Sequence, residues 1–299
     1  MSRIREERRK LDQLTSLSKI GLRARTVVDG FITGTHRSHN RGWNVEFAEF
    51  REYVKGDDIR YIDWKVYGRT DRYFIKEFEE DTSMKTYLLL DQSRSMSFGS
   101  GEMTKLEYGA LVASALSYLL IRQQDSVGLL TFDEDVVQYL PPQSSLLHLN
   151  RIWQQLEATQ PGQKTAIPKI LRNLAASLKR RGLIILISDL LDDPEDILHG
   201  LGHFRLRKCE VIVFHILDRA ELDFPYRNFL CFEELESERK MNVHSRAVRS
   251  AYLESLGEYL ETIRRGCHRA GLDYLLWPTD EPLERFLYHF LLRRQRLAR

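Results

Sequence analysis

The sequence predicts an α/β protein built on a doubly wound, mainly parallel sheet. Between residues 85 and 299, short apolar runs alternate with segments whose apolar residues recur at helical spacing. The run at 183–188 is apolar throughout, as is typical of strands that helices cover on both faces. Because strands that alternate with helices assemble into parallel sheets, this order of elements predicts the doubly wound architecture.

The individual elements follow from the spacing of the apolar residues. Strands are expected at residues 85–90, 126–132, 136–140, 183–188, 209–217, 229–232 and 272–277. Helices are expected at residues 106–120, 146–156, 167–178, 195–204, 248–267 and 283–291. The acidic turn at 133–135 lies between two of these strands, so it predicts a hairpin at one edge of the sheet.

Two further segments precede this alternation. Residues 1–29 are basic and carry Leu11, Leu14 and Leu17 on one helical face, which predicts a basic N-terminal helix. Residues 30–84 combine glycine, aromatic and charged residues with short β-like runs, which predicts a small β-rich subdomain. The remaining residues, 85–299, then form the α/β domain with a C-terminal strand and helix extension.

The composition excludes several classes of protein. With 42% hydrophobic and 29% charged residues the chain is an ordinary globular protein, and its net charge of +2 gives no electrostatic case for nucleic acid. Its three cysteines are widely spaced and form no Cys-x-x-Cys pair, which favours a reducing cytosol. The longest apolar stretch, 111–121, is too short to span a bilayer, so we expect a cytoplasmic protein without membrane insertion.

Two acidic residues stand directly after apolar strands. Asp91 follows the strand at 85–90, and Asp189 follows the strand at 183–188. In an open α/β sheet, ligands bind outside the carboxyl ends of the strands at the point where the winding direction reverses. If these two strands are neighbours at that point, both carboxylates face one crevice.

Three hydroxyl residues accompany the two acids. Ser93 and Ser95 alternate after Asp91, so their hydroxyls can point the same way, and Thr165 opens the helix expected at 167–178. Carboxylate and hydroxyl oxygens suit a hard divalent cation such as Mg²⁺ or Mn²⁺. Two carboxylates only neutralise such an ion, which leaves a ligand position for an Asp or Glu of a protein partner.

The segment from about residue 85 to 218 resembles a von Willebrand factor A domain. The metal-ion-dependent adhesion site of that family has an Asp-x-Ser-x-Ser turn, a distant Thr and a distant Asp. Asp91, Ser93, Ser95, Thr165 and Asp189 match this pattern in order. The resemblance implies a Rossmann-like fold and a non-catalytic, divalent-metal-dependent protein-binding module.

The region upstream resembles a bacterial family of unknown function, of the DUF58 type, that joins such a domain to an extended segment. Members of that family are associated with MoxR-type AAA+ ATPases, which implies an adaptor role in a chaperone-like complex. Partner-binding residues are then expected within the matching motif, namely Arg51, Tyr53, Gly56, Asp57, Asp58, Arg60, Asp63 and Trp64.

Simpler explanations exist for each of these residues. Asp91 and Asp189 suit turn or helix caps, the two serines suit a loop after a strand, and Thr165 suits a helix N-cap. A metal-dependent phosphoester hydrolase with a serine nucleophile is a competing function, although no Gly-x-Ser-x-Gly elbow is present. Nucleic-acid binding by residues 34–41 and the basic termini is another.

Overall fold

The computed structural model describes residues 18–38, 50–52, 74–76, 85–178, 181–226, 229–233 and 240–297. Internal contacts divide the chain into one unit of Met1–Ile32 with Met84–Arg299 and a second unit of Thr33–Ser83. In the second unit, strands β1 (Phe50–Glu52) and β2 (Phe74–Lys76) pair antiparallel. The first unit contains the central sheet.

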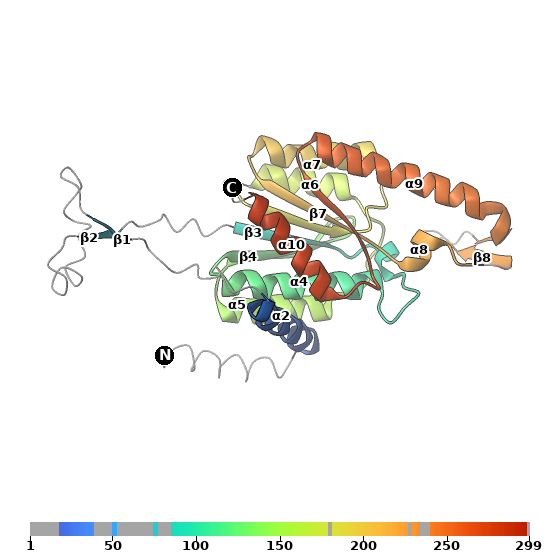
Figure 1. Cartoon of the computed structure of the whole chain (residues 1–299). Helices are drawn as coiled ribbons and strands as arrows, with labels where there is room; N and C mark the ends of the chain where they lie inside the picture. Colours follow the sequence, from blue (N-terminus) through green and yellow to red (C-terminus); the bar gives the residue numbers. More distant parts are fainter. Residues whose placement is uncertain are drawn as a thin grey trace. The chain divides into compact units, whose positions relative to one another are not determined.

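The central sheet has six strands in the order β10-β7-β6-β3-β4-β5 (Figure 1). Their bounds are β3 Lys85–Asp91, β4 Ser126–Phe132, β5 Val136–Gln143, β6 Leu183–Ser188, β7 Glu210–Leu217 and β10 Asp273–Pro278. Only the pair of β4 with the edge strand β5 is antiparallel in this sheet. The predicted doubly wound, mainly parallel sheet is therefore confirmed, as is the hairpin at its edge.

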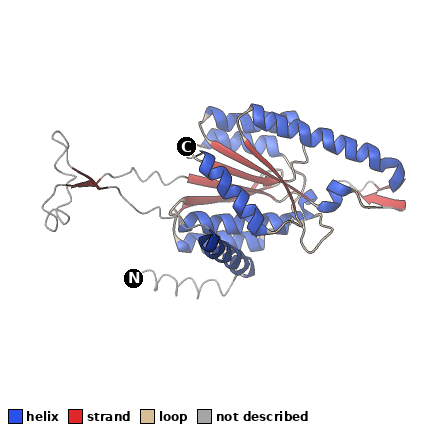
Figure 2. Cartoon of the chain, in the orientation of Figure 1, coloured by secondary structure: helices blue, strands red, loops and turns tan. Residues whose placement is uncertain are grey.

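Helices cover both faces of this sheet (Figure 2). One face is covered by α2 (Lys19–Ser38), α4 (Lys105–Arg122), α5 (Leu146–Ala158) and α10 (Leu283–Leu297). The other face is covered by α6 (Ile167–Ser177), α7 (Pro194–Leu206) and α9 (Ser245–Arg269). Shorter elements are the 3-10 helix η3 (Arg94–Ser97), helix α8 (Arg219–Asp223) and the antiparallel pair β8 (Phe229–Glu233) with β9 (Lys240–His244).

Alternate residues of each central strand divide between these two layers. Leu88 and Leu90 of β3 belong to the core under α4, whereas Leu89 belongs to the core under α6 and α7. Strand β6 follows the same rule and is fully buried along its length. Because every side chain of these strands meets a helix layer, an uninterrupted apolar run is the expected sequence for them.

Helix α4 packs very closely on the centre of the sheet. It begins with a capping box, in which Thr104 accepts a hydrogen bond from the Glu107 backbone and the Glu107 side chain accepts one from Thr104. A Cβ atom at Gly109 would lie 3.0 Å from Leu90 Cδ1 and 3.2 Å from Ile187 Cγ2. The absence of a side chain at this position lets α4 lie directly over β3 and β6.

Helix α2 extends further along the chain than the sequence pattern indicates. Residues 30–38, which the pattern assigns to an extended segment, are helical. Ala24 and Val28 are fully buried, and Gly21 lies against the ring of Trp153 in α5. Tertiary packing therefore overrides the local signal of Gly30. Residues 1–17, which carry the predicted basic helical face, lie outside the described residues.

Two expectations from composition concern the membrane and the cysteines. In the described part of the chain, no helix is both long and apolar enough to cross a membrane. Cys209 and Cys267 are buried free thiols, and burial raises the pKa of Cys267 to about 12. These two thiols therefore behave as small core residues.

We expect Gly109→Val to lower the free energy of unfolding by about 1–3 kcal/mol, because the added methyl groups have no space beneath α4. The matched control is Gly257→Ala in the exposed face of α9, where a Cβ meets nothing within 4 Å. That substitution should raise the free energy of unfolding by about 0.5–1 kcal/mol. Urea denaturation followed by circular dichroism measures both, and equal effects of the two changes would contradict the close packing of α4.

Candidate metal centre

Asp91 and Asp189 lie at the carboxyl ends of neighbouring strands. Strands β3 and β6 pair in parallel from Thr86 with Leu183 to Leu90 with Ile187. After β3 the chain builds one side of the sheet through β4 and β5, and it then returns to place β6 on the other side of β3. The two acids therefore meet at the switch point, where α/β sheets bind ligands, and both are fully buried.

The turn after β3 is fixed by the Asp91 carboxylate. Its Oδ1 accepts a hydrogen bond from the Ser93 backbone N–H at 2.8 Å, and its Oδ2 accepts one from the Ser188 hydroxyl at 2.6 Å. The hydroxyls of Ser93 and Ser95 are 3.1 Å apart. Asp91 thus serves as a turn residue, and the two alternate serines project to one side as their spacing predicts.

Thr165 lies in a loop that is attached to this turn. The Gly162 N–H donates to the Gln92 carbonyl at 2.7 Å, and the Arg94 N–H donates to the Gln163 carbonyl at 2.8 Å. The Thr165 hydroxyl is buried and has no hydrogen-bond partner within the described residues. Buried hydroxyls are nearly always satisfied in native proteins. An unpartnered hydroxyl in a loop that is bound to the Asp91 turn therefore fits a ligand position for a hard cation.

The capping explanation of Thr165 is wrong. Helix α6 begins after Ala166, so Ala166 and not Thr165 occupies the N-cap position. Pro168 in the first turn lacks an N–H, so one of the donors that a cap would satisfy is absent. The Thr165 hydroxyl therefore does not cap α6 and remains available to bind a ligand.

A buried lysine that the sequence patterns do not reveal completes the charged cluster. The ammonium of Lys105, at the start of α4, lies 2.7 Å from Asp189 Oδ2 and 2.7 Å from Glu221 Oε1 in α8. The lysine side chain is 0% exposed. A positive charge in the first turn of a helix is unfavourable, because the helix dipole is positive at that end. The position of Lys105 is therefore the one feature of the sequence that indicates a special role for it.

Burial and mutual repulsion set the protonation of this cluster. Burial, together with the negative charge of Asp189, raises the pKa of Asp91 to about 7, although hydrogen bonds from Ser188 and Ser93 oppose the shift. Burial alone lowers the pKa of Lys105, but the charges of Asp189 and Glu221 outweigh it and the pKa is raised. Lys105 pairs with Asp189 and Glu221 but not with Asp91, so a divalent cation between Asp91 and Asp189 would compensate the remaining negative charge of the cluster.

The donor set therefore fits a cation that is bound partly by hydroxyl oxygens. Within the described residues, no group of three or more His, Cys, Asp or Glu side chains is arranged to hold a metal ion. A site of two carboxylates and three hydroxyls does not belong to that type. It suits Mg²⁺ or Mn²⁺, which accept oxygen ligands and usually retain several waters.

A family model and several known proteins match this chain. A family model described as "Protein of unknown function DUF58" matches residues 49–259. This chain belongs to that family. It is 24% identical over 289 residues to the uncharacterized protein Rv1480 of Mycobacterium tuberculosis, covering 95% of this chain and 90% of the relative. The resemblance drawn from the sequence motifs is thereby confirmed at the level of the family.

Solved structures of low identity are also similar. The conserved hypothetical protein BatB from Bacteroides thetaiotaomicron gives a TM-score of 0.47 at 14% identity, covering 71% of this chain and 99% of BatB. The SpRpn10 VWA domain gives a TM-score of 0.40 at 12% identity, covering 69% of this chain and 93% of that domain.

The family motif upstream of the sheet is only partly described. Arg51 lies in β1 of the second unit. The other residues predicted to bind a partner, Tyr53, Gly56, Asp57, Asp58, Arg60, Asp63 and Trp64, lie outside the described residues.

The serines of this DUF58 protein lack the neighbour that a nucleophile needs. In the described part of the chain, no hydrogen bond joins Ser93 or Ser95 to a histidine, and the two hydroxyls face each other. His215 on β7 is 1% exposed, and its Nδ1 lies 2.8 Å from the Tyr274 hydroxyl. Burial lowers the pKa of His215 to about 4, which leaves it a weak base.

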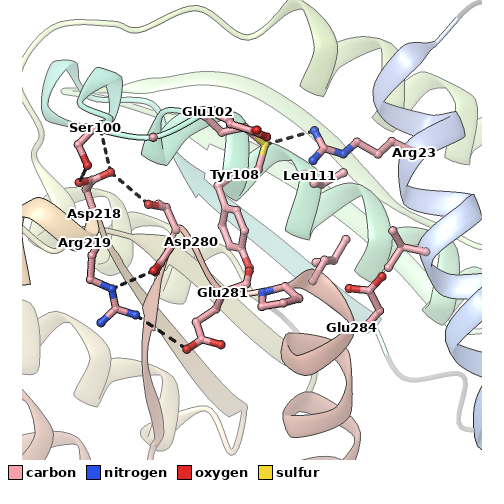
Figure 3. Close-up of a pocket in the computed structure, with 16 residues that line it drawn as sticks. Arg23, Ser100, Glu102, Tyr108, Leu111, Asp218, Arg219, Asp280, Glu281 and Glu284 are labelled. Atoms are coloured by element: carbon pink, nitrogen blue, oxygen red, sulfur yellow. Dashed lines mark hydrogen bonds and ion pairs between the residues drawn. The ribbon is translucent and has the colours of Figure 1, made fainter.

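A cavity of about 570 Å³ lies between α2, the loop after η3 and the ends of β7 and β10 (Figure 3). Asp218 accepts hydrogen bonds from the Ser100 N–H at 2.9 Å and from the Thr279 hydroxyl at 3.2 Å. Arg219 pairs with Asp280 at 3.0 Å. These polar groups largely satisfy one another. They therefore connect the loop after η3, the start of α8 and the turn after β10.

We expect Lys105→Met to lower the free energy of unfolding by about 3–5 kcal/mol in the absence of divalent ions, because Asp189 and Glu221 lose their buried counter-charge. Lys169→Met is the control, since Lys169 forms an exposed pair with Asp135. Its effect should stay below about 1 kcal/mol. Urea denaturation in EDTA measures both, and a small effect of Lys105→Met would show that the cluster does not depend on this lysine.

Proposed function

We propose that this protein is a non-catalytic protein-binding module that depends on a divalent cation at the switch point of its sheet. The observation that carries the proposal is the buried Thr165 hydroxyl, which has no partner within the described residues and belongs to a loop attached to the Asp91 turn. Asp91, Ser93, Ser95, Thr165 and Asp189 would hold the ion, directly or through water. When bound, Mg²⁺ or Mn²⁺ would supply a coordination position for a carboxylate of the partner.

The surrounding residues favour binding over turnover. Lys105 holds Asp189 in place through a 2.7 Å ion pair, so this carboxylate is already oriented and partly neutralised before an ion arrives. Asp91 is held by two hydrogen bonds from the protein. Because Asp189 is already partly neutralised by Lys105, an ion bound here would keep positive charge that attracts a further anionic oxygen, which is the requirement for a metal-bridged contact.

The partner we propose is a MoxR-type AAA+ ATPase in the cytoplasm, for which this protein would act as an adaptor in a chaperone-like complex. Support comes from membership of the DUF58 family, through the association that the sequence resemblance implies. The chain has no Gly-x-x-x-x-Gly-Lys-Ser/Thr motif, so ATP hydrolysis would belong to the partner. An acidic side chain of that partner would complete the coordination of the ion.

Thr165→Val is expected to weaken Mn²⁺ binding by about 10–100-fold while the free energy of unfolding changes by less than about 1 kcal/mol, because the lost hydroxyl has no protein partner. Asp91→Ala should abolish binding altogether. Isothermal titration calorimetry measures the affinity, and Asp135→Ala, which changes an exposed acid, is the control. Unchanged Mn²⁺ affinity in both site variants would refute the cation site.

The partner is tested by a pull-down from native cytosol with the wild-type protein in Mg²⁺, the wild-type protein in EDTA, and the Asp91→Ala variant. We expect an AAA+ ATPase to be captured only in the first sample, because the other two lack the bridging ion. A partner captured in all three samples would contradict the metal-bridged contact and would place the binding surface in residues 30–81.

A further inference from the structure

A small apolar pocket borders the proposed cation site. Its volume is about 180 Å³, and Ser95 and Lys105 belong to both its wall and the cation site. The rest of the wall comes from Phe98, from Leu191 after β6, from the segment that follows β7, and from Tyr252 of α9. This volume is below that of pockets which enclose whole small molecules, and it suits one apolar side chain.

The polar groups at the base of this pocket are already paired. Lys105 forms its two ion pairs with Asp189 and Glu221, and its ammonium lies 5.8 Å from the centre of the Phe98 ring. Because the ammonium of Lys105 and the carboxylate of Glu221 are engaged with each other and the wall is mostly apolar, an apolar occupant would gain from burial here, whereas a charged occupant would lose water. The chemistry of the pocket therefore selects an apolar group.

Aromatic rings form a rigid side of the pocket. The ring of Phe224 lies 5.3 Å from that of Tyr226 and 5.0 Å from that of Tyr252 in α9, measured between ring centres. Phe224 is 3% exposed and packs against the rings of both tyrosines. Ring contacts of this kind fix side chains in place, and a pocket between them keeps its shape without a ligand.

Leu191 is another residue of the pocket wall, and it follows a residue with an unusual backbone conformation. It follows Asp189 by two residues and is 49% exposed. Leu190, between them, has a φ of 54°, and Phe224 across the pocket has a φ of 45°. Non-glycine residues in this left-handed region carry a conformational cost, and such residues concentrate at ligand sites. Both strained residues belong to this pocket: Leu190 directly precedes Leu191 in the wall, and Phe224 is itself part of the wall.

We infer that this pocket is the specificity subsite of the proposed metal-bridged contact, and that it receives an apolar side chain next to the carboxylate that the partner gives to the ion. The inference rests on the proposed function. The partner is then a protein segment in which an Asp or Glu is adjacent to an aliphatic or aromatic residue. The ion selects the acid, and the pocket selects its neighbour.

The test uses four dye-labelled peptides of one length in a Gly-Ser background, which contain Asp-Leu, Asp-Phe, Asp-Ser or Asn-Leu at the centre. Fluorescence anisotropy with the full chain in Mg²⁺ should show Asp-Leu and Asp-Phe binding at least about tenfold tighter than Asp-Ser, because a buried apolar side chain is worth that much. Asn-Leu should bind weakly, and EDTA should remove the binding of all four.

Leu191→Ser should abolish the preference for Asp-Leu over Asp-Ser. Its matched control is Leu206→Ser, since Leu206 is 81% exposed in α7 and does not line the pocket. This control should retain the preference. Mn²⁺ affinity is measured for each variant in parallel, so that loss of the ion is not mistaken for loss of the pocket.

The outcomes separate the two proposals. Mg²⁺-dependent binding of all three Asp peptides with equal affinity would overturn the subsite and leave the proposed function standing. Failure of every peptide to bind an Mn²⁺-loaded protein would overturn both. Binding of Asn-Leu equal to that of Asp-Leu would show an apolar pocket independent of the ion. Self-association that Leu191→Ser removes would instead assign the pocket to a second copy of the chain.

Discussion

Two buried carboxylates and one partly buried carboxylate at one end of a parallel sheet are the constraint around which this structure is organised. Asp91 and Asp189 are fully buried and the Glu221 side chain is 19% exposed, and within the described residues only Lys105 forms an ion pair with any of them. Buried charge without compensation is costly in a low-dielectric interior. Hydrogen bonds and the lysine reduce this cost, and burial raises the pKa of Asp91 to about 7.

The secondary structure around the cluster follows from this requirement. The loop before α6 is bound to the Asp91 turn by two backbone hydrogen bonds, which bring the Thr165 hydroxyl to the same end of the sheet. Helix α8 begins with a capping box from Asp218, and this cap holds Glu221 where it can pair with Lys105. Helix α4, which packs closely on the sheet at Gly109, carries Lys105 at its first residue.

The contacts of the two serines support the proposed binding function. A serine nucleophile needs a base within hydrogen-bond reach, whereas Ser93 and Ser95 contact each other, and buried His215 pairs with Tyr274. A metal bridge needs only oriented oxygens, a charge deficit and access for an outside carboxylate. One contact between an ion and a carboxylate discriminates poorly among acidic partners. In the inferred contact, the pocket beside Leu191 adds an apolar interaction that distinguishes one acidic partner from another.

The sequence by itself determined the order of the six strands along the chain and of helices α4 to α7, α9 and α10, the hairpin at the sheet edge and the position of Asp91 and Asp189 at strand ends, but not η3, α8 or β9. These features depend on local periodicity and on the rule that ligands collect at the switch point, and both are visible in one chain. The roles of Lys105 and Glu221, the continuation of α2 beyond Gly30 and the pocket between Leu191 and Phe224 were decided only by the tertiary structure. Each of them depends on contacts between segments that are distant in sequence, such as Lys105 with Glu221 or Gly21 with Trp153, and no local pattern encodes such a contact.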